Sequence, residues 1–549
     1  MRLRMRKQLA WWALSATGLI CSAQALETSV GEAGINARRL HKAPYNVLGR
    51  KIAIGQIEIG RPGKFGLDKA ASGHSAASVE SVFYRNSTAG ANSHVSPHAN
   101  MVAEVMVSDD KKLRGVAPKA RLYSSAVGSL KQTGQAQECL STQHIAQRNG
   151  GDVRAINFSF GESLERDRRT DASLDGNALL TKCLDWSARV HNVVYVVAGN
   201  QGSGGIPIPS DNYNGVNLAY TTKHQGKYSK VDFANLSEQP TGIGKRLIKR
   251  EIDDGARRAI NLVAPGSKIS LYNLEGEVIQ VSGTSFAAPH LVGSVALLQE
   301  FGDSVLRQMQ GKGLQQRNSL ATPPPSRMPR YWSLDSRRHE VMKAVFLNSA
   351  DKIQDSGNGL RLGMTRTTLT KDNRTWLESD AYKNPKIPLN MEMGTGHLNA
   401  FRAYKQFSAG QWSPATSVPS RGWDYRALPA YSYQDYVFKQ PLQKGSFAAI
   451  TLAWDRLVEL KDQNNNQRYD VGEKFRDRGL NNLDIYLMAV DGKQASSKVC
   501  ASVSEVDSVE HIFCPVPSTG RYKISVQYSK QVNKATQPYG LAWWTVPAK

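Results

Sequence analysis

A serine that follows a glycine turn is the sharpest sign of chemistry in this chain of 549 residues. The segment reads Val281-Ser-Gly-Thr-Ser285-Phe-Ala-Ala-Pro289-His290, so small residues typical of a closely packed helix follow the serine. At a helix N-terminus the backbone N–H groups favour negative charge, and the N–H of Ser285 can face an oxyanion. Pro289 is expected near the helix start, where a missing N–H is tolerated. The segment predicts a serine nucleophile.

A histidine is expected to supply the base that this serine needs. A serine hydroxyl is a poor nucleophile unless a neighbour takes its proton, and the pKa of histidine lies near neutrality. We expect His98, in the segment His98-Ala-Asn-Met-Val-Ala103, to be that base. His94 lies four residues earlier, as in helical metal sites, but Pro97 between them disfavours a shared helix and a zinc ion. Two further histidines are expected to be structural or exposed: His74 and His290.

Six segments, in the expected chain order, resemble motifs of the subtilisin-like serine proteases, the subtilases. Gly283-Thr-Ser285-Phe-Ala-Ala-Pro289 is similar to the nucleophile motif Gly-Thr-Ser-x-Ala-x-Pro, and His98–Ala103 to the histidine motif, with Asn100 where threonine is usual. The other similar segments are Gly115–Ala120, Ile156–Gly161, Val197–Asn200 and Leu262–Gly266. The resemblance covers about residues 50–405 and implies a serine endopeptidase that acts on proteins or peptides.

The resemblance also implies roles for residues beyond the nucleophile and the base. The side chain of Asn200 would join the Ser285 N–H in holding the oxyanion of the tetrahedral intermediate. A substrate-binding strand would be formed by Phe158, Ser159, Phe160 and Gly161. The reaction would pass through an acyl-enzyme that water releases.

The acid is the one triad member that departs from the family pattern. Subtilases usually carry Asp-Thr-Gly or Asp-Ser-Gly after the first strand, whereas this chain reads Ile54-Gly-Gln-Ile-Glu58-Ile-Gly60. Glu58 falls on the aspartate position, and its extra methylene moves the carboxylate by about 1.5 Å unless the strand or His98 adjusts. We expect Glu58 to orient His98, since glutamate serves in triads on other folds. Asp68 is the other candidate acid.

The elements that position these residues alternate between strands and helices. Apolar runs rich in branched or aromatic residues predict buried parallel strands at Ile52–Ile57, Val153–Phe160, Val193–Val197 and Ile260–Ala264. Helical spacing of apolar residues predicts helices at Met101–Val107, Ser141–Gln147, Leu174–Val190 and His339–Leu347. This alternation predicts an α/β fold, a parallel sheet flanked by helices. Met393–Ala400 is expected to be a tight turn before a last helix.

The chain is too long for one hydrophobic core, and its sequence pattern changes along its length, which indicates several domains. Beyond about residue 420, alternating strands and turns predict a separate all-β sandwich, with strands at Ala448–Trp454, Leu483–Ala489, His511–Cys514, Tyr522–Tyr528 and Leu541–Val546. The predicted units are a signal peptide (1–25), a short N-terminal segment (26–50), a peptidase domain (51–408) with a Pro-rich linker or insertion (311–335), and the sandwich (420–549).

The N-terminal segment and the cysteines indicate export. A basic start, an apolar stretch from Leu9 to Cys21 and Ala23-Gln-Ala25 predict a secretory signal cut after Ala25, so that the protein is periplasmic or extracellular with no membrane span in the mature chain. Four cysteines then remain, and an oxidising compartment favours disulfides. Three pairings are possible, and the local one joins Cys139 to Cys183 and Cys500 to Cys514.

The net charge of +23, or +19 without the four cations of the signal, is spread along the chain rather than gathered in blocks. No nucleic-acid motif accompanies it, so we expect a solvated basic surface, no nucleic-acid partner and a monomer. Salt-sensitive attachment to an anionic polymer is the alternative.

An Asn-rich loop near the C-terminus has the spacing of an EF-hand. Oxygen-bearing side chains stand at positions 1, 3, 5, 9 and 12 of a twelve-residue loop, and position 7 offers a backbone carbonyl. In order, these residues are Asp462, Asn464, Asn466, Arg468 (the carbonyl), Asp470 and Glu473. Gln467 replaces the usual glycine at position 6. We expect a structural Ca²⁺ here, the alternative being a polar turn without an ion.

Two other functions compete with peptide hydrolysis. Gly283–Ala287 nearly matches the Gly-x-Ser-x-Gly elbow of esterases, but Ala287 replaces the last glycine and the candidate base precedes the serine. The second alternative is a protease-like binding protein without catalysis, in which Glu58 is only a structural carboxylate and Ser285 is unreactive.

Overall fold

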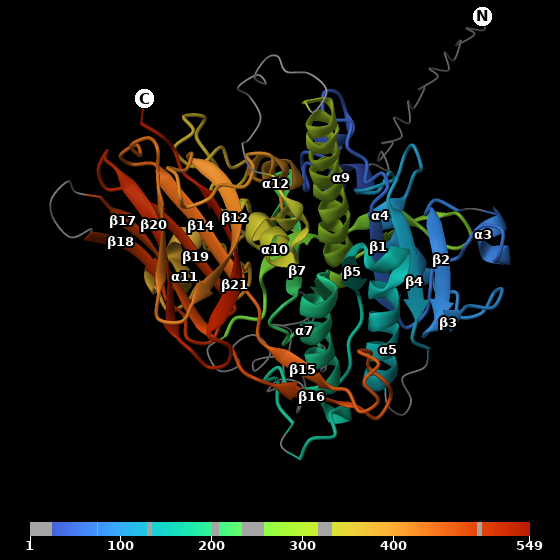
Figure 1. Cartoon of the computed structure of the whole chain (residues 1–549). Helices are drawn as coiled ribbons and strands as arrows, with labels where there is room; N and C mark the ends of the chain where they lie inside the picture. Colours follow the sequence, from blue (N-terminus) through green and yellow to red (C-terminus); the bar gives the residue numbers. More distant parts are fainter. Residues whose placement is uncertain are drawn as a thin grey trace, which may run out of the picture.

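The protein folds into an α/β part and an all-β part that lie side by side (Figure 1). The computed structural model describes residues 25–73, 75–128, 134–170, 172–199, 208–232, 257–316, 332–490 and 497–548. The predicted signal peptide, His74 and Asn200 lie outside these residues, apart from Ala25 at the predicted cut.

A nine-stranded sheet forms the centre of the α/β part, in the order β3-β2-β4-β1-β5-β6-β7-β8, with β9 beside β7. Its strands are β1 (Ala53–Glu58), β2 (Val79–Tyr84), β3 (Ser87–Thr88), β4 (Arg121–Ala126), β5 (Val153–Phe158), β6 (Val194–Ala198), β7 (Val216–His224), β8 (Lys227–Val231) and β9 (Leu262–Pro265). All neighbours are parallel except β3 and β8, which run antiparallel to β2 and β7. The four predicted strands are present, buried between helices as their apolar runs require.

Helices cover the two faces of this sheet with separate hydrophobic cores. α4 (Pro97–Val107) and α9 (Thr284–Gln316) contribute to one core, and α5 (Gly134–Ala146) and α7 (Leu179–His191) to the other. α10 (His339–Asn348) and α12 (Ala400–Phe407) lie toward the all-β part (Figure 1). The shorter helices are α1 (Ala25–Val30), α2 (Arg38–His41), α3 (Lys69–Gly73), α6 (Arg148–Gly151), α11 (Asp380–Lys383) and the 3₁₀ turns Leu164–Arg166, Leu334–Arg337 and Trp376–Glu378.

Several boundaries differ from the sequence prediction. α7 begins at Leu179 rather than at residue 174, because Gly176 turns the chain with a φ of +81° and its N–H donates to the Asp211 carboxylate at 2.8 Å. α5 begins at Gly134, one turn or more before the predicted start, and β5 ends at Phe158. α9 continues to Gln316, into the predicted insertion; residues 317–331 lie outside the described chain.

The N-terminal residues that follow the predicted cut pack into the peptidase core. Val30, Ile35 and Leu40 are fully buried in the core that α4 and α9 share. The hydroxyl of Ser29 lies 3.0 Å from Nε2 of His290, whose Nδ1 lies 2.7 Å from the Phe286 carbonyl. His290 is therefore structural, as predicted.

The all-β part consists of two four-stranded antiparallel sheets around one core, which confirms the predicted sandwich. One sheet has the order β12-β21-β14-β19 and the other β13-β20-β17-β18. Their strands are β12 (Arg421–Pro429), β13 (Tyr433–Val437), β14 (Phe447–Trp454), β17 (Asn482–Ala489), β18 (Ser497–Ser502), β19 (Val509–Pro515), β20 (Tyr522–Lys530) and β21 (Thr536–Trp544). A small hairpin, β15 (Val458–Lys461) with β16 (Lys474–Asp477), leaves the sandwich and contacts α7; β10 (Ile269–Tyr272) pairs with β11 (Val278–Val281) elsewhere.

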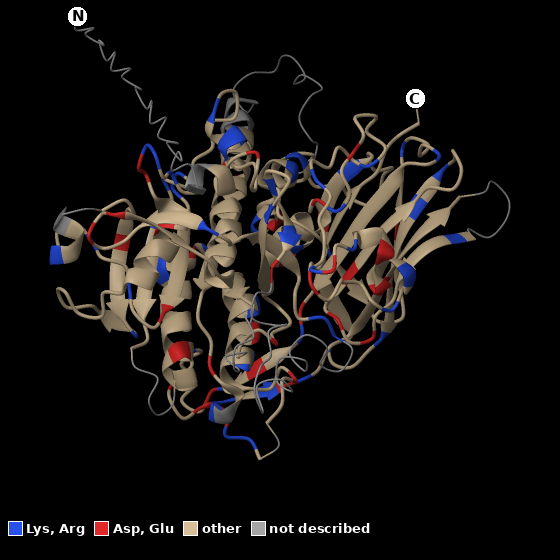
Figure 2. Cartoon of the chain, turned by 180° about the vertical axis from the view of Figure 1, so that it is seen from behind, with Lys and Arg blue, Asp and Glu red and all other residues tan. Residues whose placement is uncertain are grey.

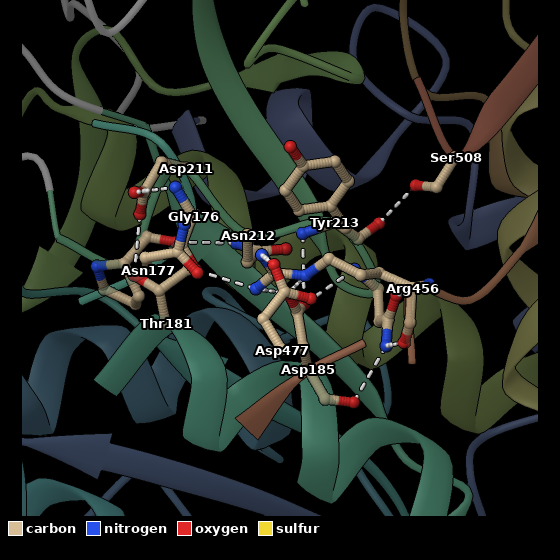
Figure 3. Close-up of polar contacts among 12 residues, drawn as sticks. Gly176, Asn177, Thr181, Asp185, Asp211, Asn212, Tyr213, Arg456, Asp477 and Ser508 are labelled. Atoms are coloured by element: carbon tan, nitrogen blue, oxygen red, sulfur yellow. Dashed lines mark hydrogen bonds and ion pairs between the residues drawn. The ribbon is translucent and has the colours of Figure 1, made fainter. Parts of the chain in front are cut away.

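An arginine from the sandwich is inserted into the α/β part (Figure 3). Arg456 donates from Nε and Nη2 to one carboxylate oxygen of Asp185, at 3.0 and 2.6 Å, and from Nη2 to the Gly176 carbonyl at 2.7 Å. Its backbone N–H donates to Asn214 Oδ1 at 2.8 Å, and its guanidinium stacks 4.4 Å from the ring centre of Tyr213. The two parts are therefore held together by a buried polar network.

Two disulfides close local loops, Cys139–Cys183 and Cys500–Cys514, which confirms the local pairing. No helix of the described chain is both long enough and apolar enough to span a bilayer. Lys and Arg residues of the described chain occur along the ribbon of both parts (Figure 2).

Removing the shorter disulfide is expected to destabilise the protein. Cys500 and Cys514 are 14 residues apart, and a cross-link of that span lowers the entropy of the unfolded chain by an amount worth about 3 kcal/mol. Replacing both with serine should lower the free energy of unfolding by about that much in urea titrations followed by far-UV circular dichroism. Equal stability of the variant and the parent would contradict this expectation.

Candidate active site

The residues singled out by the motifs lie at the carboxyl edge of the parallel sheet. β1 ends at Glu58 and β5 at Phe158, while α4 begins at Pro97 and α9 at Thr284. Open α/β sheets bind ligands at this edge, because strand ends and helix N-termini meet there. The fold thus brings the predicted base, acid and nucleophile to one region.

Glu58 contacts His98, as predicted from its place at the end of β1. Its Oε2 lies 3.4 Å from Nδ1 of His98; the glutamate is 2 % exposed and the histidine side chain 42 % exposed. Burial lowers the pKa of His98, but the charge of Glu58 and a hydrogen bond to it raise the pKa by more, so the net pKa lies above its ordinary value. The second oxygen of Glu58, Oε1, is buried without a hydrogen-bond partner.

The start of α4 holds His98 in place. The hydroxyl of Ser96 caps the helix by accepting the N–H of Ala99 at 3.4 Å, and Pro97 occupies the first helical position, where its missing N–H costs nothing. Gln56, two residues before Glu58 on β1, donates from Nε2 to the Ala99 carbonyl at 2.9 Å. β1 therefore both carries the predicted acid and fixes the helix turn that carries the predicted base.

Ser285 is held to the end of β5 by two hydrogen bonds. Its Oγ donates to the Ser159 carbonyl at 3.1 Å, and the Ser159 hydroxyl donates to the Ser285 carbonyl at 2.9 Å. The second bond compensates for Pro289, which lies inside α9, farther from its start than predicted, and has no N–H to offer that carbonyl. Asn157 in turn donates from Nδ2 to the Ser159 hydroxyl at 2.8 Å.

The neighbouring residue ties the nucleophile helix to β6. Thr284 Oγ1 donates to the Gly199 carbonyl at 2.8 Å, and the Gly199 N–H donates to the Leu218 carbonyl at 2.8 Å. Gly199 directly precedes Asn200, the predicted oxyanion donor. Among the described contacts, the Ser285 hydroxyl bonds Ser159 and not His98, so attack on a substrate requires a rotation of the serine side chain.

The geometry favours neither Asp68 as the triad acid nor a helical metal site formed by His94 and His98. Asp68 accepts two hydrogen bonds from Arg61, at 2.6 and 2.8 Å, and backbone N–H groups of Lys64 and Asn92. Burial raises the pKa of Asp68 and these bonds lower it by more, so the carboxylate is a charged structural partner of Arg61. His94 precedes α4 and stacks on Tyr84, 4.1 Å between ring centres, so it shares no helix with His98.

The predicted substrate-binding segment has buried side chains, so only its backbone is available for contact with a substrate. Phe158, Ser159 and Phe160 are all buried, and Phe158 packs 5.6 Å from Phe160 in the core between β5 and α7. A substrate could therefore contact the main chain here and the partly exposed Gly161.

Beyond Gly161 lies a buried carboxylate pair that no motif indicated. Glu162 lines a cavity of about 470 Å³, and neither it nor Glu138 of α5 has a hydrogen-bonded oxygen outside the pair. Burial and the charge of Glu162 raise the pKa of Glu138, and burial raises that of Glu162. A Cβ on Gly134 would lie 1.7 Å from the Glu162 carboxylate, so this glycine makes room for the pair. Only Glu162 had a sequence signal, its place directly after the substrate segment.

Comparison with known proteins decides the family. Residues 49–364, more than half of the chain, match the model of the subtilase family. The chain belongs to the subtilase family. This subtilase is 26 % identical over 256 residues to subtilisin DY of Bacillus licheniformis, which covers 46 % of this chain and 77 % of that protein. It is 23 % identical over 207 residues to thermitase of Thermoactinomyces vulgaris, 38 % of this chain and 61 % of that one.

Two solved protease structures match this subtilase at low sequence identity and low TM-score. The prenylagaramide maturation protease PagA is 21 % identical to this subtilase, with a TM-score of 0.37, and the match covers 65 % of this chain and 92 % of that one. A cold adapted subtilisin-like serine proteinase is 20 % identical, with a TM-score of 0.31 over 46 % of this chain and 78 % of its own. Family membership supports a serine peptidase at the level of the family.

The Asn-rich loop of this subtilase adopts turns suited to cation binding. Asp462 accepts the N–H groups of Asn466 and Gln467, at 3.2 and 2.7 Å, and Asn466 Oδ1 accepts that of Arg468 at 2.7 Å. Gln467 has a φ of +60°, the left-handed conformation for which glycine is usually chosen, and Asn465 has a φ of +58°. The backbone thus makes the turn at position 6 of the loop with glutamine in place of the usual glycine.

The ligand side chains of the loop converge, although they bond one another in this structure. Asp470 Oδ2 accepts the amide groups of Asn464 and Asn466, at 2.8 and 2.7 Å. Both oxygens of Glu473 accept backbone N–H groups, from Gln463 at 2.8 Å and Asp470 at 2.9 Å. An asparagine amide turned by 180° presents its oxygen in place of its nitrogen, so the donor set fits a calcium ion.

A second acidic group, His339, Glu340 and Asp455, has ligand atoms within 4.8 Å of one another at the junction of the two parts. Nε2 of His339 lies 3.0 Å from both oxygens of Asp455, and Nδ1 lies 3.2 Å from Glu340 Oε2 and 3.1 Å from Asn192 Oδ1. Burial lowers the pKa of His339, but Asp455 and Glu340 raise it by more, so the net pKa lies above its ordinary value. Because both ring nitrogens face oxygen atoms that can accept a hydrogen bond, this group fits an ion-pair network better than a metal site.

Proposed function

We propose that this chain is an exported serine endopeptidase, in which Ser285 attacks the peptide carbonyl, His98 takes and returns the proton, and Glu58 orients His98. The observation that carries the proposal is the 3.4 Å approach of Glu58 to Nδ1 of His98, at the sheet edge where Ser285 begins a helix. The backbone N–H of Ser285 and the side chain of Asn200 would hold the oxyanion.

The arrangement is suited to each chemical step. With Nδ1 protonated and directed at Glu58, Nε2 of His98 is left free to accept the Ser285 proton. The nearby carboxylate then stabilises the imidazolium that forms, and the imidazolium returns the proton to the leaving amine. Water attacks the acyl-enzyme by the same route in reverse.

Labelling with a fluorophosphonate probe tests the nucleophile. The full chain should become covalently labelled, and a Ser285→Ala variant should not, because only an activated serine reacts with this class of reagent. A second assay distinguishes a peptidase from an esterase. A peptidase should cleave a protein substrate and show no preference for short acyl esters. Absence of label on a folded chain would overturn the proposal.

The alternative is a binding protein without catalysis. It is favoured by Oε1 of Glu58, which is buried without a partner, and by the Ser285 hydroxyl, which bonds Ser159 in this structure. A folded, unlabelled chain that retains affinity for peptides would support it.

The pH dependence of activity should reflect the His98–Glu58 contact. The base works in its neutral form, and the pKa of His98 is raised above 6.5, so kcat/KM should fall as the pH is lowered through a value higher than that of an ordinary histidine. A pH–rate profile with its acidic limb at or below pH 6.5 would contradict this expectation. The limb should be measured on a peptide substrate without groups that titrate in this range.

We further propose that the loop 462–473 binds a structural Ca²⁺. Calcium at 100 times its dissociation constant should stabilise the fold by about 2.7 kcal/mol, which calorimetry detects as a higher Tm. Glu473→Gln should abolish the rise, whereas Glu505→Gln, which removes an exposed carboxylate elsewhere in the sandwich, should not. A Tm that is indifferent to calcium would show that the loop closes through its own hydrogen bonds.

A further inference from the structure

A cavity of about 520 Å³ lies where the α/β part meets the sandwich. Its walls come from α12, the segment before β12, the end of β21 and the turn at Gly359–Gly363. Three cations and two indole rings face it, from Arg402, Lys405, Arg421, Trp412 and Trp544. The catalytic residues proposed above are not among its lining.

The described lining of this cavity holds cations but no carboxylate, and Arg402 alone among the three has a described ion pair, with Asp351 behind the wall. The side chain of Arg421 makes no hydrogen bond or ion pair with the described residues, and its Nε is buried without a partner. Arg402 is 2 % exposed; it donates to the carbonyls of Ser349 and Leu362, but its Nη2 is buried and unpaired. Burial and the charges of Arg421, Arg39 and Arg402 lower the pKa of Lys405. Positive charge is therefore concentrated here beyond what the fold neutralises.

The nearest carboxylates are already committed elsewhere. Asp351 lies 3.2 Å from Arg402 but also 3.4 Å from Arg366, and it accepts the Thr365 hydroxyl at 2.6 Å. Asp355 accepts four backbone N–H groups of its own turn. No Asp or Glu is among the described residues that line the cavity.

The guanidinium groups are held in position before any ligand arrives. Arg402 and Arg421 lie 4.5 and 4.6 Å from the ring centre of Trp544. Stacking on an aromatic ring leaves the N–H edge of a guanidinium directed outward, and two such edges suit the oxygens of a phosphate or sulfate.

We propose that this cavity binds a small organic molecule that carries a phosphate or sulfate group. Its volume lies within the range of about 300–1,000 Å³ typical of small-molecule pockets, so it holds more than a bare oxyanion. The oxyanion would neutralise Arg421 and Lys405 and would accept from the unpaired Nη2 of Arg402, since a buried donor without a partner is costly. The organic part would contact Trp412 and the apolar wall. Such a group occurs both on free metabolites and at the end of an anionic polymer, and either source presents the same oxyanion to the cavity.

Isothermal titration of the full chain tests the proposal without reference to peptidase activity. The probes are glucose 6-phosphate, inorganic phosphate, uncharged glucose and a short heparin oligosaccharide, whose sulfates belong to a polymer. We expect glucose 6-phosphate or the oligosaccharide to bind more tightly than inorganic phosphate, with a change in tryptophan fluorescence, and glucose not to bind. Tighter binding of glucose 6-phosphate would indicate a free ligand, and tighter binding of the oligosaccharide would indicate an anionic polymer.

Variants assign the binding to the cavity. Arg421→Gln should weaken it about tenfold or more, and Lys405→Gln, an exposed position with little risk to folding, should weaken it several-fold. The matched control is Arg476→Gln, which removes an exposed cation from β16. Absence of binding by both organic probes, equal affinity for inorganic phosphate, or an equal loss in Arg476→Gln would overturn the proposal.

Discussion

A roughly ten-thousandfold lower kcat is the expected result of replacing Glu58 with glutamine, by analogy with loss of the triad acid in other serine proteases. Glu58 is buried and 3.4 Å from Nδ1 of His98, so the amide would occupy the same space without the negative charge. The imidazolium formed during catalysis would lose its main electrostatic partner, and an amide N–H directed at Nδ1 would favour the wrong tautomer. Single-turnover and steady-state kinetics on one peptide substrate measure this effect.

The same variant should also change the pH profile, which separates an electrostatic role from a loss of folded protein. Because the charge of Glu58 raises the pKa of His98, Glu58→Gln should move the acidic limb of kcat/KM to lower pH. Glu80→Gln, an exposed carboxylate on β2, should leave both kcat and the limb unchanged. Activity of Glu58→Gln within a few-fold of the parent would show that another group orients His98.

Replacing Arg456 with methionine is expected to lower the free energy of unfolding by about 3–5 kcal/mol, the usual cost of removing one partner of a buried ion pair. Arg456 and Asp185 are both buried, and the pair joins the sandwich to α7 (Figure 3). The variant would leave the Asp185 carboxylate facing only the N–H groups of Tyr213 and Asn214. Denaturant unfolding followed by fluorescence measures the loss.

An exposed ion pair of the same part serves as the control. Arg478 lies 3.7 Å from Glu459 with both side chains substantially exposed, so Arg478→Met should cost less than about 1 kcal/mol. In the double variant Arg456→Met with Asp185→Asn, much of the stability should return, because no buried charge is left unpaired and the amide oxygen can still accept the N–H groups of Tyr213 and Asn214. A single variant as stable as the parent would mean that apolar contacts alone join the two parts.

The local features of this fold were predictable because they depend on neighbouring residues. Strands β1, β5, β6 and β9 follow from short apolar runs, and the start of α9 from a glycine turn before small residues. Boundaries were less accurate where distant residues determine them. α7 begins late because Asp211, far along the chain, accepts the N–H of Gly176, which no local periodicity reveals.

The candidate site was predictable in its residue types and only partly in its geometry. Ser285 and His98 were identified by motif, whereas Glu58 and Asp68 were both acceptable acids on sequence grounds. The structure distinguishes them because Arg61 occupies Asp68 and β1 directs Glu58 to His98. The oxyanion donor Asn200 remains a prediction, since it lies outside the described residues.

By itself, the sequence determined the α/β sheet with an appended sandwich and the family motifs, since these depend on backbone preferences and short spacings. It left three disulfide pairings possible, and the tertiary structure selected the local one. Only the tertiary structure decided which charges meet. Arg456 pairs with Asp185 across 271 positions, Glu138 lies beside Glu162, and three cations line one cavity that no described Asp or Glu lines. Such pairings depend on the packing of whole elements, and the energy of a charge depends on its burial and neighbours, which no short stretch of sequence contains.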